Sequence, residues 1–141
     1  MNLLVSACLL GIRCRYDGDA KPNPAVVELA RRHTLVPVCP EQLGGLPTPR
    51  PPAERCGNGV FTKAGADVTE AYRRGAEETL KLCRLFGCDA AILKERSPSC
   101  GCGEIYDGTH TDTRIAGDGV TAELLKANGI AVYGESKIEA L

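Results

Sequence analysis

Short apolar runs alternate with longer amphipathic segments along the chain, which is the pattern of an α/β protein. Residues 3–5 and 90–93 are continuous apolar runs of strand length, typical of strands buried on both faces of a parallel sheet. Residues 35–38 form another run, in which Pro37 removes one backbone donor and favours a weaker strand. A closing strand is expected at residues 130–132.

Helical spacing separates these runs. Asn23 and Pro24 predict the N-cap and first residue of a helix that ends near His33. The best helical pattern in the chain follows Asp67 and Glu70, which have the spacing of a capping box. Its apolar stripe and its stop are formed by Ala76, Leu80, Cys83, Phe86 and Gly87.

Two further segments complete the predicted organisation. Asp118 is expected to cap a last helix over residues 119–128, which Gly129 ends. Residues 44–59 are dense in glycine and proline, so we expect a long, stiff and ordered loop without regular structure. The chain carries no internal repeat.

This alternation of strands and helices predicts a mostly parallel, Rossmann-like sheet with helices on both faces, in a single domain over residues 1–141. Such sheets bind ligands beyond the carboxyl ends of their strands. Cys8, Cys39 and Cys100 each follow a predicted strand by one to seven residues. We therefore expect three thiols that are far apart in the sequence to meet at one edge of the sheet.

Composition narrows the classes of function. A formal charge of -1, no polybasic run and an aromatic content of 4% make polymeric nucleic acid an unexpected partner. No apolar stretch reaches the roughly 20 residues that span a bilayer, and the start of the chain lacks the basic leader of a secretion signal. We therefore expect a cytoplasmic protein of undefined oligomeric state, in which eight cysteines point to metal or thiol chemistry.

The cysteine spacing leaves the kind of centre open. Soft thiolates select zinc, copper(I) or iron-sulfur clusters, and a site with three thiolates keeps one position free for chemistry. Cys8 and Cys14 lie six residues apart, and Cys100 and Cys102 form C-x-C. These spacings fit neither a zinc ribbon nor a single-cluster ferredoxin run.

The other five cysteines have less specific interpretations. Cys83 belongs to an apolar helical stripe and Cys88 precedes a strand, so both are expected to pack as small apolar side chains. Cys14, Cys56 and Cys102 lie in polar loops, where they could support the site, serve as spare ligands or be surface thiols.

Several polar residues accompany the three strand-end thiols. Glu41 is two residues after Cys39 and is a candidate general acid or base, although a solvated turn carboxylate fits its position equally well. Ser97 precedes Cys100 by three residues and could donate a hydrogen bond or simply cap a loop. Arg50 lies on the stiff loop, where it could bind an anion, such as an anionic group of a substrate, although an ordinary surface arginine fits its position equally well.

The two histidines give no basis for histidine catalysis. His33 ends a predicted helix, where it would interact with the helix dipole, and His110 is a loop residue with no evident partner. No Walker, G-x-S-x-G or G-x-G-x-x-G motif is present, so nucleotide hydrolysis and dinucleotide binding have no motif.

Three segments together resemble the thiouracil desulfurase family, in order and with similar spacing along nearly the whole chain. They are SACLLG with CRYDG at residues 6–18, PVCPE with GGLPTPR at residues 37–50, and SPSCG at residues 97–101. The low aromatic content is a departure for a pyrimidine pocket, since Tyr16 is the only aromatic residue within these segments.

The resemblance implies a 4Fe-4S cluster held by Cys8, Cys39 and Cys100, with one iron free to take the sulfur of a thiolated uracil. The implied reaction is a non-redox desulfuration of this small-molecule substrate, with release of sulfide. Glu41 would activate the attacking water and Ser97 would orient the substrate or the water. The isomer of thiouracil, and whether it is a free base or a nucleotide, stay open.

Two alternatives belong to other functional classes. A non-catalytic metal or cluster-binding module would keep the thiols but would gain nothing from Glu41 and Ser97. A thiol or persulfide sulfur-carrier protein would use a cysteine of low pKa and would work without metal.

Overall fold

Four parallel strands form the centre of the computed structural model, which describes residues 1–141. Their order is β2-β1-β5-β8, with bounds β1 (Asn2–Ser6), β2 (Thr34–Val38), β5 (Ala90–Leu93) and β8 (Ala131–Gly134). The predicted α/β fold class and the predicted strands are confirmed. Because β2 lies at the edge of the sheet and pairs only with β1, the missing donor of Pro37 is tolerated.

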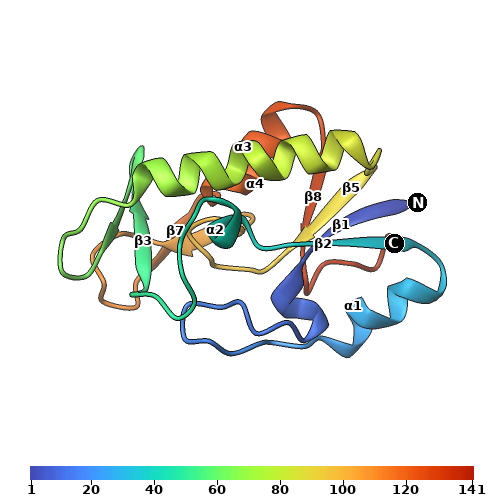
Figure 1. Ribbon diagram of the computed structural model, residues 1–141, viewed down its shortest axis with the longest axis horizontal. Coiled ribbons are helices and arrows are strands. Elements are labelled where there is room, and N and C mark those ends of the chain that lie inside the picture. The colour runs from blue at the N-terminus through green and yellow to red at the C-terminus, as the bar shows by residue number, and fades with distance from the viewer.

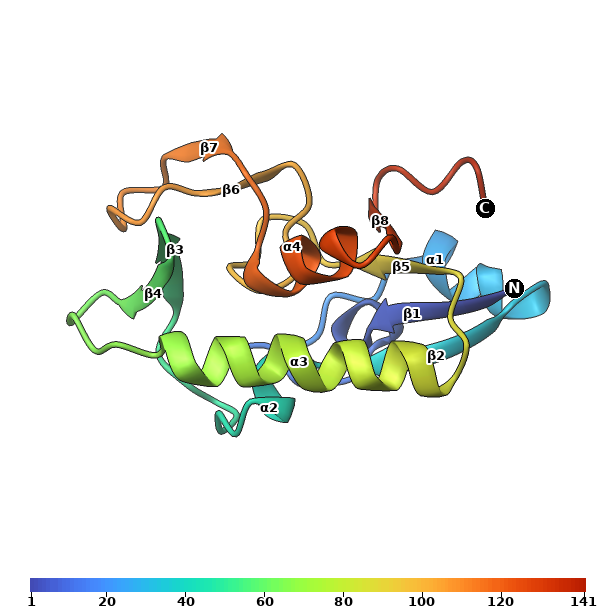
Figure 2. The ribbon, with the colours of Figure 1, turned by 90° about the horizontal axis from the view of Figure 1, so that it is seen from above.

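Helices cover both faces of this sheet (Figure 1). The helix α1 (Pro24–Glu28), continued by the 3-10 turn η2 (Leu29–Arg31), lies on one face. On the other face lie α3 (Thr69–Leu85) and α4 (Val120–Ala127), which run side by side (Figure 2). Two short elements complete the set, the 3-10 turn η1 (Ala7–Leu10) and α2 (Pro40–Leu43).

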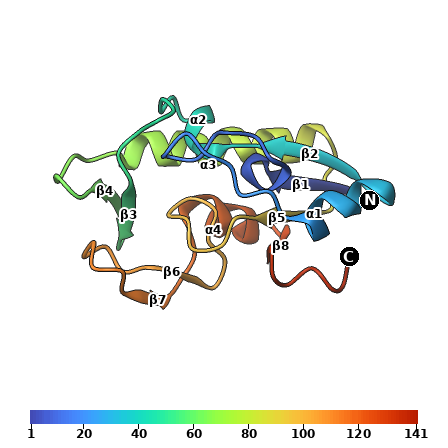
Figure 3. The same ribbon diagram turned by 90° about the horizontal axis from the view of Figure 1, so that it is seen from below.

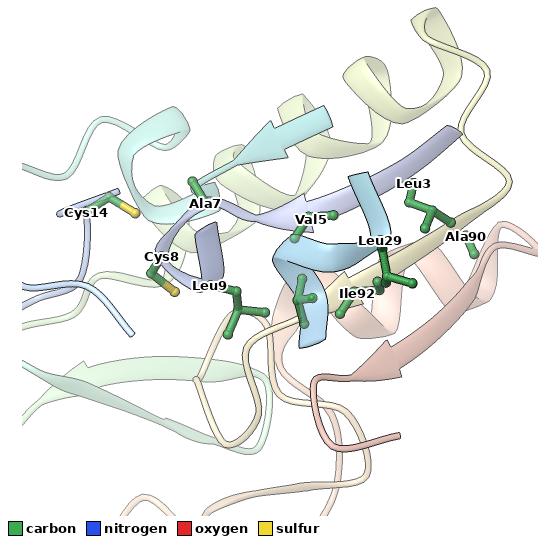
Figure 4. Close-up of a cluster of buried hydrophobic side chains, with 10 residues drawn as sticks. Leu3, Val5, Ala7, Cys8, Leu9, Cys14, Leu29, Ala90 and Ile92 are labelled. Carbon is green, nitrogen blue, oxygen red and sulfur yellow. The ribbon is translucent and has the colours of Figure 1, made fainter. Parts of the chain in front are cut away.

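The alternation of side chains along the strands divides the core in two. Leu3, Val5 and Ile92 pack against α1 and its continuation, as Figure 4 shows for one of these clusters. Leu4 and Leu93 point to the opposite face and pack against α3 and α4. Strands buried on both faces explain why these segments are apolar runs without alternation in the sequence.

Two antiparallel ribbons lie at the end of the molecule opposite the N-terminus (Figure 3). They are formed by β3 (Ala53–Cys56) with β4 (Gly59–Thr62) and by β6 (Glu104–Tyr106) with β7 (Arg114–Ala116). The expectation of a loop without regular structure over residues 44–59 is therefore wrong for its last part. The proline-rich stretch ends at Pro52, and Gly57, with φ 59°, makes the hairpin turn.

The predicted helix ends are partly confirmed. The Asn23 side chain accepts hydrogen bonds from the backbone N–H groups of residues 25 and 26 and caps α1. Gly87 and Gly129 have left-handed φ angles of 58° and 78° beyond α3 and α4. The capping box predicted at Asp67 is not formed, because Val68 is the N-cap residue of α3. The Asp67 side chain nevertheless accepts a hydrogen bond from the backbone N–H of Thr69 at 3.0 Å.

The predicted cap of the last helix is also wrong. Gly119 is the N-cap residue of α4, while Asp118 accepts hydrogen bonds from the backbone N–H of Gly103 and from Lys126 Nζ. No helix in the structure is both long enough and apolar enough to cross a membrane.

Candidate functional site

The carboxyl ends of β1, β2 and β5 open onto one cavity of about 700 Å³. Cys8 lies on η1 directly after β1, Cys39 follows β2 and is the N-cap residue of α2, and Cys100 lies in the loop after β5. The strand pattern predicted this meeting of distant segments. The six residues predicted for the site all line the cavity: Cys8, Cys39, Glu41, Arg50, Ser97 and Cys100.

A fourth thiol belongs to the same cavity. Cys14 is 2% exposed and lines the cavity together with Cys8 and Cys39. Its backbone carbonyl accepts a hydrogen bond from Cys39 Sγ at 3.6 Å. Figure 4 shows Cys8 and Cys14 beyond the end of β1, at the margin of the apolar cluster. Of the three loop cysteines whose roles the sequence left open, only Cys14 lines the cavity.

The cavity disfavours free thiolates. The hydrogen bond from Cys39 lowers the pKa of Cys14, but the bond to Cys8 and burial outweigh it and raise that pKa to about 11. The pKa of Cys39 is raised by its bond to Cys14, then by burial and the Glu41 charge. Burial, followed by the Glu41 charge, raises the pKa of Cys100. A positive centre is therefore needed to hold these cysteines as thiolates.

Ser97 shapes the loop that carries Cys100. Its Oγ accepts hydrogen bonds from the backbone N–H groups of Ser99 at 3.1 Å and Cys100 at 3.0 Å. A buried hydrogen bond also ties this loop to α4, because Ser99 Oγ and Thr121 Oγ1 are 2.7 Å apart. The hydroxyl proton of Ser97 has no partner in the protein, so it is available to a ligand in the cavity.

Glu41 and Arg50 form an ion pair on the cavity wall. Arg50 Nη2 lies 3.1 Å from Glu41 Oε2, and the two side chains are 3% and 14% exposed. Arg50 Nη2 also donates to the Cys14 carbonyl at 3.0 Å, and Nη1 donates to Thr48 Oγ1 and the Pro47 carbonyl. Glu41 Oε1 makes no hydrogen bond with the protein, so one carboxylate oxygen is free for a ligand.

These contacts bear on the predicted role of Arg50. Both terminal nitrogens of its guanidinium donate to protein acceptors, and only the buried Nε lacks a partner. The arginine therefore fixes Glu41 and the Cys14 backbone in place. Contact between Arg50 and the substrate stays a prediction.

The donor set suits a polynuclear cluster better than a single ion. No three His, Cys, Asp or Glu side chains converge as ligands of one metal ion. A cubane cluster instead spreads its thiolate ligands over separate iron corners, so they need not approach one another as closely. Soft sulfur donors that surround a cavity of about 700 Å³ fit such a cluster together with a small ligand.

The remaining cysteines lie outside this cavity. Cys56 is exposed on β3, and Cys102 donates through its thiol to the Val132 carbonyl at 3.5 Å. Cys83 is buried against Cys88, where the chain passes from α3 into the turn at Gly87. An apolar contact between the residue after the glycine and a residue in the last turn of the helix commonly accompanies a helix that ends at a left-handed glycine.

Several residues of the cavity wall are not expected from the sequence. His110 also lines the cavity, and its Nδ1 lies 3.7 Å from Glu54 Oε2. The expectation that this loop histidine has no partner is therefore wrong. Tyr72 and Tyr106 line the cavity in addition to Tyr16, which removes the apparent shortage of aromatic residues. The signal available for Tyr72 was its place one turn into the central helix, on the side that is buried.

A second hollow of about 450 Å³ lies between β4 and the start of α3, around Asn58, Asp67 and Glu70. None of the eight cysteines lines it. The thiols, the carboxylate and the hydroxyl that could do chemistry are therefore gathered in the larger cavity.

Comparison with known proteins agrees with this geometry. A family model described as 2-thiouracil desulfurase matches residues 3–137. The uncharacterized protein YbbK of Bacillus subtilis (strain 168) is 45% identical over 146 residues, which cover 96% of this chain and 97% of YbbK. The solved structure of the 4Fe-4S-dependent thiouracil desulfidase TudS is 47% identical, with a TM-score of 0.94 over 99% of this chain and 94% of TudS.

Proposed function

This chain belongs to the 2-thiouracil desulfurase family, and from that premise we propose that it is a 4Fe-4S-dependent desulfidase that hydrolyses the C=S bond of a thiolated uracil. Water replaces sulfur on the ring carbon, so that thiouracil and water give uracil and hydrogen sulfide. The observation that carries the proposal is the meeting of Cys8, Cys39, Cys100, Glu41 and Ser97 around one cavity.

We further propose that Cys8, Cys39 and Cys100 hold the cluster and leave one iron without a cysteine ligand. When bound, the cluster supplies a soft Lewis acid that prefers the sulfur of the substrate to the oxygen of the product. The raised pKa of Cys39 and that of Cys100 mean that both thiols release their protons as the cluster binds.

Glu41 serves as the general base. Its Oε2 is fixed by Arg50, whereas Oε1 makes no hydrogen bond with the protein, and the residue lines the cavity. The carboxylate accepts a proton from the attacking water, and that proton later leaves with the sulfide. The ion pair fixes the direction of the carboxylate, so that it is in position before the substrate arrives.

Ser97 orients the substrate or the attacking water. Its oxygen accepts two backbone N–H groups, so its proton can only be donated outward, toward the cavity. The same two bonds shape the loop that carries Cys100, which places the hydroxyl at a fixed distance from the cluster ligand.

Both alternative classes fit the site less well. A non-catalytic metal or cluster-binding module gives no role to the free Glu41 oxygen and the free Ser97 hydroxyl proton at the cavity, and no three ligands converge on a single ion. A sulfur carrier needs a thiol that ionises easily, whereas three of the four cysteines that line the cavity, Cys14, Cys39 and Cys100, have a raised pKa.

The direct test is sulfide release from 2-thiouracil and 4-thiouracil by the anaerobically reconstituted protein. Glu41→Gln keeps the shape of the side chain but removes its basicity, so we expect the rate to fall about 10² to 10⁴-fold. Glu77→Gln, at an exposed position of α3, is the matched control and should keep the activity of the unsubstituted protein. Equal sulfide release by Glu41→Gln would contradict the role of this carboxylate.

A further inference from the structure

Tyr72 is a buried tyrosine on the wall of the proposed active site. It lies on the first turn of α3, is 4% exposed and lines the cavity that contains the thiols and Glu41. It does not belong to any of the segments that resemble the desulfurase family.

Close packing of two helices fixes Tyr72 relative to Glu41. A Cβ atom on Gly75 would lie 2.0 Å from the carbonyl oxygen of Pro40, and one on Gly44 would lie 2.0 Å from that of Ala71. Only glycine allows the backbones of α2 and α3 to approach so closely. Glu41 follows Pro40 and Tyr72 follows Ala71 in the chain, so this contact places the two side chains against the same cavity.

The Tyr72 hydroxyl has no hydrogen-bond partner in the protein. Only two side-chain nitrogen or oxygen atoms, His33 Nε2 and Arg50 Nε, lack both a hydrogen-bond partner and solvent-accessible surface. The unpartnered tyrosine oxygen is not one of them, so it has accessible surface, which we place at the cavity that Tyr72 lines. Buried tyrosines ordinarily satisfy their hydroxyl groups. A hydroxyl left free at a cavity that also presents a free carboxylate oxygen points to a ligand as its missing partner.

The surroundings keep this hydroxyl protonated. Burial is the main cause that raises the pKa of Tyr72, and the negative charge of Glu41 raises it further, against the opposing effect of Arg50. A phenol that stays neutral can donate a hydrogen bond throughout the reaction. Because Glu41 activates the attacking water, a donor that lines the same cavity as Glu41 can reach the oxygen of that water.

We propose that Tyr72 is a further catalytic residue, whose hydroxyl donates a hydrogen bond to the oxygen that enters from water. This role rests on the proposed function. As the water oxygen bonds to the ring carbon, one of its protons passes to Glu41 and the electron pair of the C=S bond moves onto sulfur. The hydroxyl left on the carbon then gives up its second proton to the departing sulfur, and negative charge develops on the oxygen as that proton leaves. The C–S bond breaks, the oxygen becomes the new carbonyl of uracil, and the proton held by Glu41 completes hydrogen sulfide. A fixed donor directed at this oxygen stabilises the charge where it develops.

If Tyr72 has this role, its removal should change kcat much more than KM. The entering oxygen is absent from the substrate, so Tyr72→Phe should lower kcat about a hundredfold and leave the KM for thiouracil nearly unchanged. The oxygen is present in the product, so uracil should bind to the anaerobic holoenzyme roughly two- to tenfold more weakly, as measured by calorimetry. Tyr133→Phe on β8, which does not line the cavity, is the matched control.

The outcomes separate this role from the proposed function. If the unsubstituted protein releases no sulfide from either thiouracil, the proposed function fails and the role of Tyr72 fails with it. If that protein is active while Tyr72→Phe keeps its kcat within twofold, only the role of Tyr72 is overturned. A lowered iron content or Tm in Tyr72→Phe, or a loss confined to KM, would also overturn it, because each indicates a structural or binding role.

Discussion

One guanidinium group organises the reacting side chains of this site. Arg50 reaches the Glu41 carboxylate, the Cys14 carbonyl and the residues around Thr48 with its two terminal nitrogens. The Cys14 carbonyl also accepts from Cys39 Sγ. A single planar side chain therefore links the proposed general base, one proposed cluster ligand and the loop between Cys8 and Tyr16.

Arg50→Lys tests this linkage. Lysine keeps the positive charge but cannot donate in several fixed directions, so we expect about 1–3 kcal/mol lower stability in urea unfolding. The kcat should fall at least about tenfold, because Glu41 is no longer held in one orientation. Arg73→Lys is the control, since Arg73 pairs with Glu70 on the exposed surface of α3 and such pairs contribute little. A variant as stable and as active as Arg73→Lys would contradict the linkage.

The residues of the site differ in how far the sequence reveals them. Cys8, Cys39 and Cys100 were found because they follow apolar runs, and the topology of a parallel sheet brings such positions together. The partner of Arg50 could not be found, because its contact with Glu41 depends on how the proline-rich loop folds back. Tyr72 was missed because a tyrosine on a helical stripe has the same pattern as a core residue.

At the scale of elements, the contact between α2 and α3 positions the site. The short α2 carries Cys39 as its N-cap residue and Glu41 in its first turn. Four residues are too few for an isolated helix to be stable, so α2 depends on its neighbour. Gly44 and Gly75 allow the two backbones to touch. A glycine in the middle of a long helix was the available sequence signal for this contact.

Gly75→Ala tests the contact. Alanine is the better helix former by about 1 kcal/mol, but its Cβ would lie 2.0 Å from the Pro40 carbonyl oxygen, and backbone cannot yield as a flexible side chain does. We expect a net loss of about 1–3 kcal/mol in thermal unfolding, together with a lowered iron content, because α2 must move.

The control for this variant is Glu77→Ala, at an exposed position two residues further along α3. It should leave the Tm and the iron content nearly unchanged. A Gly75→Ala protein that is more stable than the unsubstituted chain and binds its full iron would show that α2 is positioned by something other than this contact.

Elements that depend on a local sequence pattern could be predicted, whereas elements held by contacts between distant segments could not. The strands of the sheet and the end of α3 at Gly87 are local patterns and were predicted. The β3–β4 and β6–β7 ribbons were not, because their strands are short and their apolar signal is weak. They are held partly by contacts between distant segments, such as Glu54 with the backbone N–H groups of Gly108 and His110.

At the scale of the whole molecule, the sheet and the ribbons have separate tasks. The sheet and its helices bring three chain segments to one edge. The ribbons lie at that same end of the molecule (Figures 1 and 3), and Glu54 and Tyr106 from them line the cavity. The arrangement encloses the thiols, which shields a cluster and its ligand from bulk water.

The most direct test of cluster-dependent desulfuration measures sulfide release from thiouracil as a function of bound iron, during anaerobic reconstitution. We expect release to rise with iron and to reach its maximum at about four irons per chain. Cys39→Ser should hold less iron and release little sulfide, whereas Cys56→Ser, at an exposed position outside the cavity, should match the unsubstituted protein. Sulfide release without bound iron would contradict the dependence on the cluster. A Cys39→Ser protein that is equally active and holds its full complement of iron would contradict the role of Cys39 as a cluster ligand.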